Sequence, residues 1–149
     1  MSLPFIHNPA DIIRWLMIDK GIGTDPADGG LWPIYRGSEP DTPDSVITVY
    51  GTTGQQDGRS QVSGEVFEHH GYMIRVRSNR ESTASEKAYA IDQILNEQVA
   101  NQLVNIDGNT YIVCAVNRKG SVNSVGKESP TSERNVFTIN AISAIYRTS

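Results

Sequence analysis

Val46–Tyr50 reads VITVY, a run of β-branched and aromatic residues with apolar side chains at both odd and even positions. Such a run is typical of a central strand that is covered on both faces, and Gly51 ends it. Farther along the chain, Tyr72–Arg77 alternates strictly, with tyrosine, isoleucine and valine on one face and methionine and two arginines on the other. These two segments predict the centre of a β-sheet.

Two helices are expected, one before these strands in the sequence and one after them. Asn8–Asp11 is a good helix start, because asparagine caps, proline suits the first turn and aspartate meets the positive end of the dipole. That helix should run to about Lys20. Its apolar residues, including Trp15, spread around most of the circumference, so it packs under its own fold or under a neighbouring subunit. Thr83–Glu86 matches a capping box and opens the longest helix, which is expected to reach about residue 103.

Short strands complete the pattern. Leu31–Arg36 contains a proline and is expected at a sheet edge. Val104–Ile106 and Tyr111–Val116 flank an Asp-Gly turn, which predicts a hairpin whose second strand is apolar on both faces. Val136–Tyr146 is the expected final strand. The order α-β-β-β-α-β-β-β predicts an α+β fold over residues 1–149, with a mainly antiparallel sheet of about six strands and two main helices packed against it.

Composition narrows the class of protein. A chain of 149 residues suits a single core, and a net charge of −4 argues against a dedicated nucleic-acid binder. A mildly acidic wall past which DNA slides remains compatible with that charge. Cys114 is the one cysteine, so no intrachain disulfide forms, and we expect it to be a small buried hydrophobe. With no signal-peptide pattern and no apolar run of ~20 residues, we expect a soluble protein made in a reducing cytosol and no membrane partner.

Catalytic and metal-binding patterns are not found. His69 and His70 are adjacent in an extended segment, so their side chains point to opposite faces and cannot both bind one ion. The acidic residues between positions 25 and 44 lie beside proline or glycine, where turn formation explains them. Gly58–Val62 lacks the last glycine of a nucleophile elbow, and Gly120–Lys127 lacks the Gly-Lys-Ser/Thr of a phosphate loop. We therefore expect no catalytic residue, no metal and no cofactor.

Two long polar segments, at about residues 52–63 and 118–133, are expected to be loops. Loops of this length are usually functional or disordered, and we favour their being held by neighbouring chains over packing within the domain. The long helix adds a further sign, because Tyr89 and Gln93 lie opposite its expected buried stripe on a face with little charge. Such a face suits contact with another protein.

Two segments also resemble a known family. Val46–Gly54 resembles the strand-plus-glycine element of phage minor capsid or tail-completion proteins, and Gly71–Ser78 resembles their following strand, which ends in Arg-Val-Arg. The helix expected at Ser85–Leu103 and the first helix lie where that family has them, so the similarity covers roughly residues 9–117. The chain is thus similar to the tail terminators of siphophages.

This resemblance implies a structural virion protein and no enzyme. Such proteins form a hexameric ring on the last ring of tail-tube subunits, stop the polymerisation of the tube and join it to the neck or connector. The implied partners are other copies of the chain, the tail-tube protein, the neck/connector protein and double-stranded DNA that passes non-specifically through the lumen. The implied location is the head-proximal end of the tail, after assembly in the host cytoplasm.

Contacts between subunits or with the tube are expected from the two polar segments, through residues 55–59 or Ser121–Ser132. Arg75 and Arg77 are candidate donors of inter-subunit salt bridges, against the alternative of two solvated arginines on the outer strand face. The full set of candidate contact residues is Trp15, Gln55, Gln56, Asp57, Arg59, Arg75, Arg77, Tyr89, Gln93, Lys119 and Lys127.

Three alternatives stay open at this point. The nearest is another ring-forming protein of the head-to-tail joint, such as a neck or adaptor component. The others are a small hydrolase or nucleotide-binding domain that uses His69 or His70, and an α+β adaptor of non-viral origin.

Overall fold

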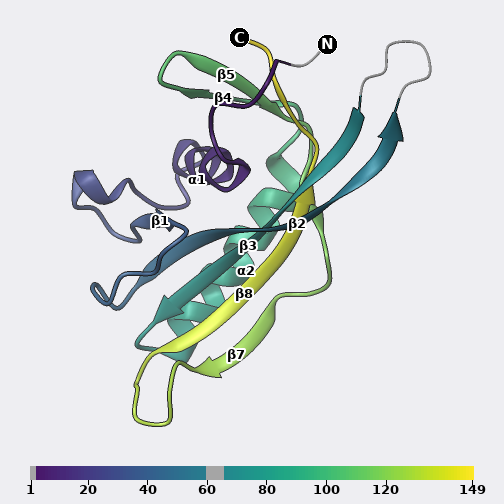
Figure 1. Ribbon diagram of the computed structural model, residues 1–149. Helices are drawn as coiled ribbons and strands as arrows, with labels where there is room; N and C mark the ends of the chain where they lie inside the picture. Colours follow the sequence, from purple (N-terminus) through teal and green to yellow (C-terminus); the bar gives the residue numbers. More distant parts are fainter. Residues whose placement is uncertain (1–2, 60–65) are drawn as a thin grey trace.

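The computed structural model describes residues 3–59 and 66–149 (Figure 1). Its elements, in chain order, are α1 (Pro9–Asp19), the 3-10 turn η1 (Pro26–Asp28), β1 (Ile34–Arg36), β2 (Val46–Arg59), β3 (Val66–Ser78), α2 (Glu81–Gln98), β4 (Gln102–Ile106), β5 (Asn109–Val113), β6 (Asn117–Arg118), β7 (Asn123–Lys127), β8 (Asn135–Ser143) and β9 (Ile145–Arg147).

The strands form two sheets. Within the described residues the main sheet has six strands in the order β1-β2-β3-β8-β6, and β7 also pairs with β8; the small sheet has the order β4-β5-β9. Among the strands that the structure describes, only β1 and β2 pair in parallel, so the prediction of a mainly antiparallel α+β fold is confirmed. The strand predicted over Leu31–Arg36 lies at the sheet edge as β1, but it begins at Ile34, after the proline. The predicted final strand is wrong as one element, because it is interrupted at Ala144 and its two parts join different sheets.

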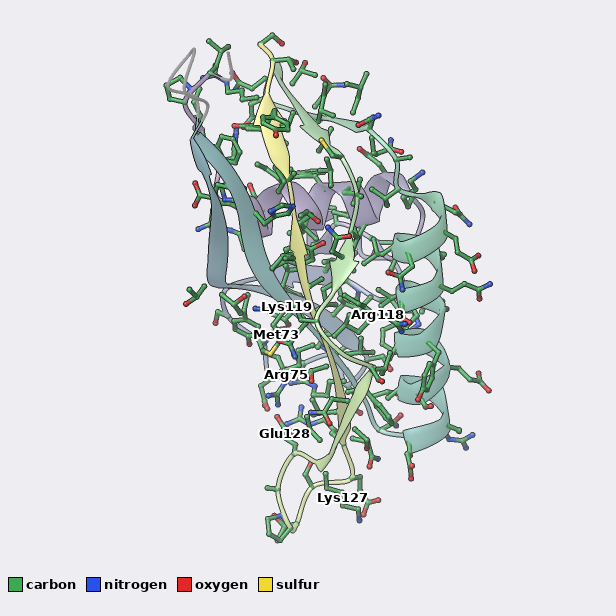
Figure 2. All side chains as sticks on the ribbon, turned by 90° about the vertical axis from the view of Figure 1, so that its right-hand side faces the viewer. Met73, Arg75, Arg118, Lys119, Lys127 and Glu128 are labelled. Atoms are coloured by element: carbon green, nitrogen blue, oxygen red, sulfur yellow. The ribbon has the colours of Figure 1, made fainter. Side chains whose placement is uncertain are left out.

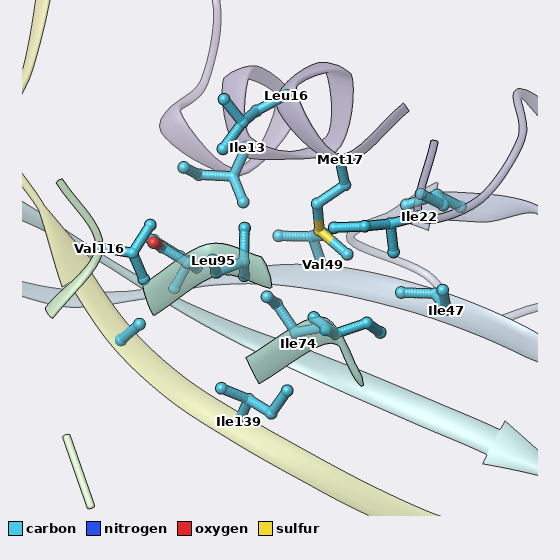
Figure 3. Packing of buried hydrophobic residues seen from close by; sticks show 14 of the residues in the cluster. Ile13, Leu16, Met17, Ile22, Ile47, Val49, Ile74, Leu95, Val116 and Ile139 are labelled. Carbon is cyan, nitrogen blue, oxygen red and sulfur yellow. The ribbon is translucent and has the colours of Figure 1, made fainter. Parts of the chain in front are cut away.

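Both helices pack on the same side of the main sheet, and the core lies between the helices and the sheet (Figure 3). Ile13, Leu16 and Met17 of α1 are fully buried, and Ile13 and Met17 project toward Val49 of the sheet. Leu95 of α2 joins the same cluster. The wide apolar surface of α1 is thus explained within the chain, because α1 contacts both the main sheet and β4.

The limits of the long helix differ from the prediction. It begins at Glu81, and its N-cap Arg80 makes no side-chain capping bond, so the predicted capping box is wrong. It ends at Gln98, and Leu103 belongs to β4. In β4, Val104 and Ile106 are buried on one face while their neighbours are not, which is the period of a strand. Pairing with β5 decides the conformation of this segment.

Both predicted loops contain strand. The polar segment from Thr52 continues β2 as far as Arg59, and the remainder of that predicted loop, residues 60–63, lies outside the described residues. The second predicted loop contains β7 and the end of β6. Neither segment shows an apolar period in the sequence, so local pattern alone does not predict these strands.

Candidate assembly surfaces

The strand pair β2–β3 extends well beyond the rest of the main sheet (Figure 1). From Val46 to Thr52, β2 pairs with β3, and β3 in turn pairs with β8 from His70 onward. Farther out, β2 and β3 pair only with each other, from the Gln55–His69 pair to the Arg59–Val66 pair. We call this outer part, residues 54–59 and 66–69, the arm. Both of its edges are unpaired among the residues that the structure describes.

The root of the arm is shaped by two glycines. The register of the pair shifts between Thr52 and Gln55, which is a β-bulge, and such bulges bend and twist a strand pair. A Cβ atom at Gly54 would lie 2.1 Å from the carbonyl oxygen of His69, and one at Gly71 would lie 2.5 Å from that of Thr53. Only glycine allows the two backbones to approach this closely, so the direction of the arm depends on these positions.

The N-terminal segment braces the arm root against the small sheet. The ring of Phe5 lies 5.0 Å from that of His70 and 5.5 Å from that of Tyr111. The hydroxyl oxygen of Tyr111 accepts hydrogen bonds from the backbone N–H groups of Ile6 and His7, at 3.2 and 3.1 Å. Burial lowers the pKa of His70 from its ordinary value of 6.5, an effect that Glu68 opposes and His69 strengthens. The root therefore favours a neutral imidazole.

Arg75 and Glu128 lie on the face of the main sheet opposite α2 (Figure 2), and they belong to a group of ion pairs that also includes Arg77, Arg134 and Glu39. Arg75 Nε lies 3.0 Å from Glu39 Oε2, and Arg77 Nη1 lies 3.7 Å from Glu39 Oε1. Arg77 also lies 3.8 Å from Glu128, which in turn lies 2.7 Å from Arg134. These ion pairs hold the β1–β2 and β7–β8 connections against this end of the sheet.

Arg77 was expected to donate a salt bridge to a neighbouring subunit, and its position does not suit that role. The residue is 1% exposed. Its guanidinium donates hydrogen bonds to the backbone oxygens of Asp41, Pro43 and Asp44 within its own chain. The strand alternation was right about the face, but the sequence could not show that the segment around Asp41 covers it. Arg75 is partly exposed, and its partner Glu39 also belongs to the same chain.

Residues 16–146 match the family of the bacteriophage tail terminator protein. The chain belongs to the bacteriophage tail terminator family. Family membership makes it a structural protein of a phage tail and a component of the virion. No curated protein matches the sequence.

Two solved structures resemble this tail-terminator chain. One comes from the virion of a native gene transfer agent particle; it is 12% identical, with a TM-score of 0.50, and the match covers 76% of this chain and 78% of the other. At that identity the likeness shows the fold alone. A second structure is 13% identical with a TM-score of 0.49, covering 93% of this chain and 95% of the other.

The remaining candidate residues of this terminator lie in four separate places. Trp15 is half-buried under the guanidinium of Arg14, whose central carbon lies 5.0 Å from the ring centroid. On α2, Tyr89 is 57% exposed and Gln93 is exposed beside it. Lys119 and Lys127 are exposed; Lys119 follows β6 and Lys127 ends β7, the two short strands that pair with β8 (Figure 2). The arm contains the other four, Gln55, Gln56, Asp57 and Arg59.

Sequence reasoning missed two features of these surfaces. It described the arm as a loop, although the glycines at positions 54 and 71 were a usable signal for close backbone approach. It also expected Cys114 to be buried, whereas this thiol is half-exposed just after β5, and partial burial raises its pKa. Among residues 3–59 and 66–149, no cluster of three potential metal ligands and no helix able to span a membrane is found.

Proposed function

We propose that this chain forms a ring, hexameric in the family's manner, on the last ring of tail-tube subunits at the head-proximal end of the tail. The ring stops the polymerisation of the tube and offers its other face to the neck or connector. Membership of the tail terminator family supports this function. A capping ring works by geometry, because a head-to-tail interface propagates until a subunit matches only one of its two faces.

The arm is the structural feature on which the ring proposal depends. A two-stranded ribbon is marginally stable in water without further packing, and the described part of the arm pairs with no third strand. Exposed strand edges are templates for pairing with another chain. A neighbouring subunit that covers the arm supplies the missing packing, and closing the ring leaves no arm uncovered.

The net charge of −4 fits a lumen through which DNA passes. A strongly basic wall would hold the phosphate backbone, whereas a mildly acidic protein repels it. Three basic residues on the outer sheet face, Arg75, Arg77 and Arg134, already have carboxylate partners within the chain. They are therefore not available as a set of free phosphate ligands.

Removal of the arm tests this proposal. Replacing residues 53–70 with an Asn-Gly turn would join Thr52 to Gly71, which are already paired in the body of the sheet. We expect a folded monomer that no longer forms rings, and tails of uneven length in phage that carry only this variant. Native mass spectrometry and electron microscopy measure the two effects. Leu31→Ser, at a position that is 85% exposed and remote from the arm, is the matched control and should form normal rings.

Rings and a uniform tail length in the armless variant would contradict the proposal. A neck or adaptor ring remains the second candidate function, because it would use the same closed geometry. Purified tails without heads separate the two, since a terminator stays on headless tubes and a neck protein does not. A hydrolase based on the paired histidines is disfavoured, because the His70 ring packs against Phe5.

A further inference from the structure

The outer face of the small sheet carries an uncharged apolar patch. Leu103, Ile112 and Tyr146 are directly opposite one another in the register of β4, β5 and β9, so their side chains share one face. The ladder continues one step farther, because the N–H of Cys114 donates to the carbonyl of Ala144 at 3.0 Å. By strand alternation these two residues lie on the same face. We call these five residues the small-sheet patch.

The patch is uncovered in the single chain. Leu103 is 54% exposed, and the other four residues are each partly exposed. The opposite face of the small sheet is closed, since Val104, Tyr111 and Val113 are fully buried. One face of the small sheet is therefore part of the core, while the other is open.

The amino-acid pattern of β5 indicates that something covers this open face. The segment Tyr111–Val116 reads YIVCAV and is apolar at both odd and even positions. This pattern is typical of a strand that is buried on both faces. The chain itself buries only one of them. A contiguous apolar surface on a soluble protein commonly marks a contact with another protein.

We propose that the small-sheet patch receives the arm of the next copy in the ring. This inference rests on the ring proposed above and names the surface that closes it. The arm and the small sheet lie at the same end of the molecule but on opposite sides of it (Figure 1). A ring needs two different, complementary surfaces placed in this way, so that one surface of each copy contacts the other surface of the next copy. The first part of the arm, residues 54–56, is uncharged like the patch.

The single native cysteine allows a direct test. Glu68 is exposed on the arm, and Cys114 lies on the patch, so Glu68→Cys places one thiol on each surface. After assembly on tail tubes, a short bifunctional maleimide should join successive copies into a ladder that ends at the closed ring. Glu68→Cys with Cys114→Ser should give no ladder. Thr131→Cys, exposed in the β7–β8 connection, is the control for a thiol placed elsewhere and should also give none.

The outcomes separate this inference from the proposed function. Normal rings without a ladder, in which Cys114 reacts with maleimide as fast as in the free chain, would overturn the arm-to-patch contact alone. Crosslinks from Cys114 to the tube protein would also overturn it, because another polypeptide then covers the patch. Failure of the unmodified chain to form rings on tubes would overturn both. If Glu68→Cys prevents assembly, Thr53→Cys places the thiol at an exposed position immediately before the arm and gives the same test.

Discussion

The inner and outer halves of the β2–β3 pair differ although they belong to the same two strands. In the inner half, β2 lies between β1 and β3, β3 lies between β2 and β8, and Ile47, Val49 and Ile74 are fully buried. In the outer half, the two strands pair only with each other within the described residues. The comparison indicates that stability resides in the body of the sheet, whereas the arm is available for contacts with other chains.

The largest expected effect is at Arg77, in the inner half. Arg77→Met removes a fully buried guanidinium that donates to three backbone oxygens and lies near two carboxylates. We expect the free energy of unfolding to fall by about 3 kcal/mol, because buried charged partners lose their counter-charge. Urea denaturation measures this change. Arg36→Met is the control, since Arg36 is half-exposed and its pair with Asp11 is 3.8 Å long. Its effect should stay below about 1 kcal/mol.

Equal losses for the two arginine variants would contradict the assignment of Arg77 to the stable body. A loss of ring formation with unchanged stability would instead restore Arg77 as an inter-subunit donor.

A smaller effect is expected at the junction of the two halves. Gly71→Ala would place a Cβ 2.5 Å from the backbone oxygen of Thr53, and backbone cannot move aside as a side chain does. We expect a loss of about 2 kcal/mol and a larger relative loss of ring formation, because the arm changes direction. Gly51→Ala is the matched control, since its Cβ would meet nothing closer than Asn8 Oδ1 at 3.8 Å. Thermal unfolding and native mass spectrometry report the two effects. Normal rings in the Gly71 variant would show that the close approach of the two backbones at the arm root does not orient the arm.

The smallest effect concerns pH at the arm root. Because the pKa of His70 lies below 6.5 in the folded protein, the unfolded chain binds this proton more readily. The contribution of the neutral His70 side chain to the stability of the folded protein is therefore complete above pH 6.5. It is lost as the pH falls from 6.5 through the lowered pKa. We expect the amide exchange rates of residues 68–71, corrected for intrinsic rates, to increase as the pH is lowered from about 7 to about 5. The increase should be no more than about tenfold. Amides of residues 74–76 in the body serve as the internal control.

His70→Gln should remove this pH dependence at the arm root. A dependence that persists in the variant would assign it to another group, such as Glu68 or the neighbouring His69.

The sequence predicted the elements with a strong local signal. Alternation placed Tyr72, Ile74 and Val76 on one face, which the structure buries in the core. The Asp-Gly pair predicted the hairpin, where residues 107 and 108 both have positive φ angles. The predictions failed where the deciding contacts are distant in the chain. The arm residues lack an apolar period and so predict a loop, although they pair as strands. Local propensity predicts a helix at Leu103, where pairing to β5 gives a strand.

By itself, the sequence determined the α+β class, the two helices and the resemblance to tail terminators, because residue periodicity and short turn signals act over a few neighbours. Only the tertiary structure decided that Arg77 is enclosed, that β2 and β3 leave the sheet as an arm, and that the small sheet keeps one apolar face open. Each of these features depends on chain segments that are far apart in the sequence, and burial follows from how those segments pack.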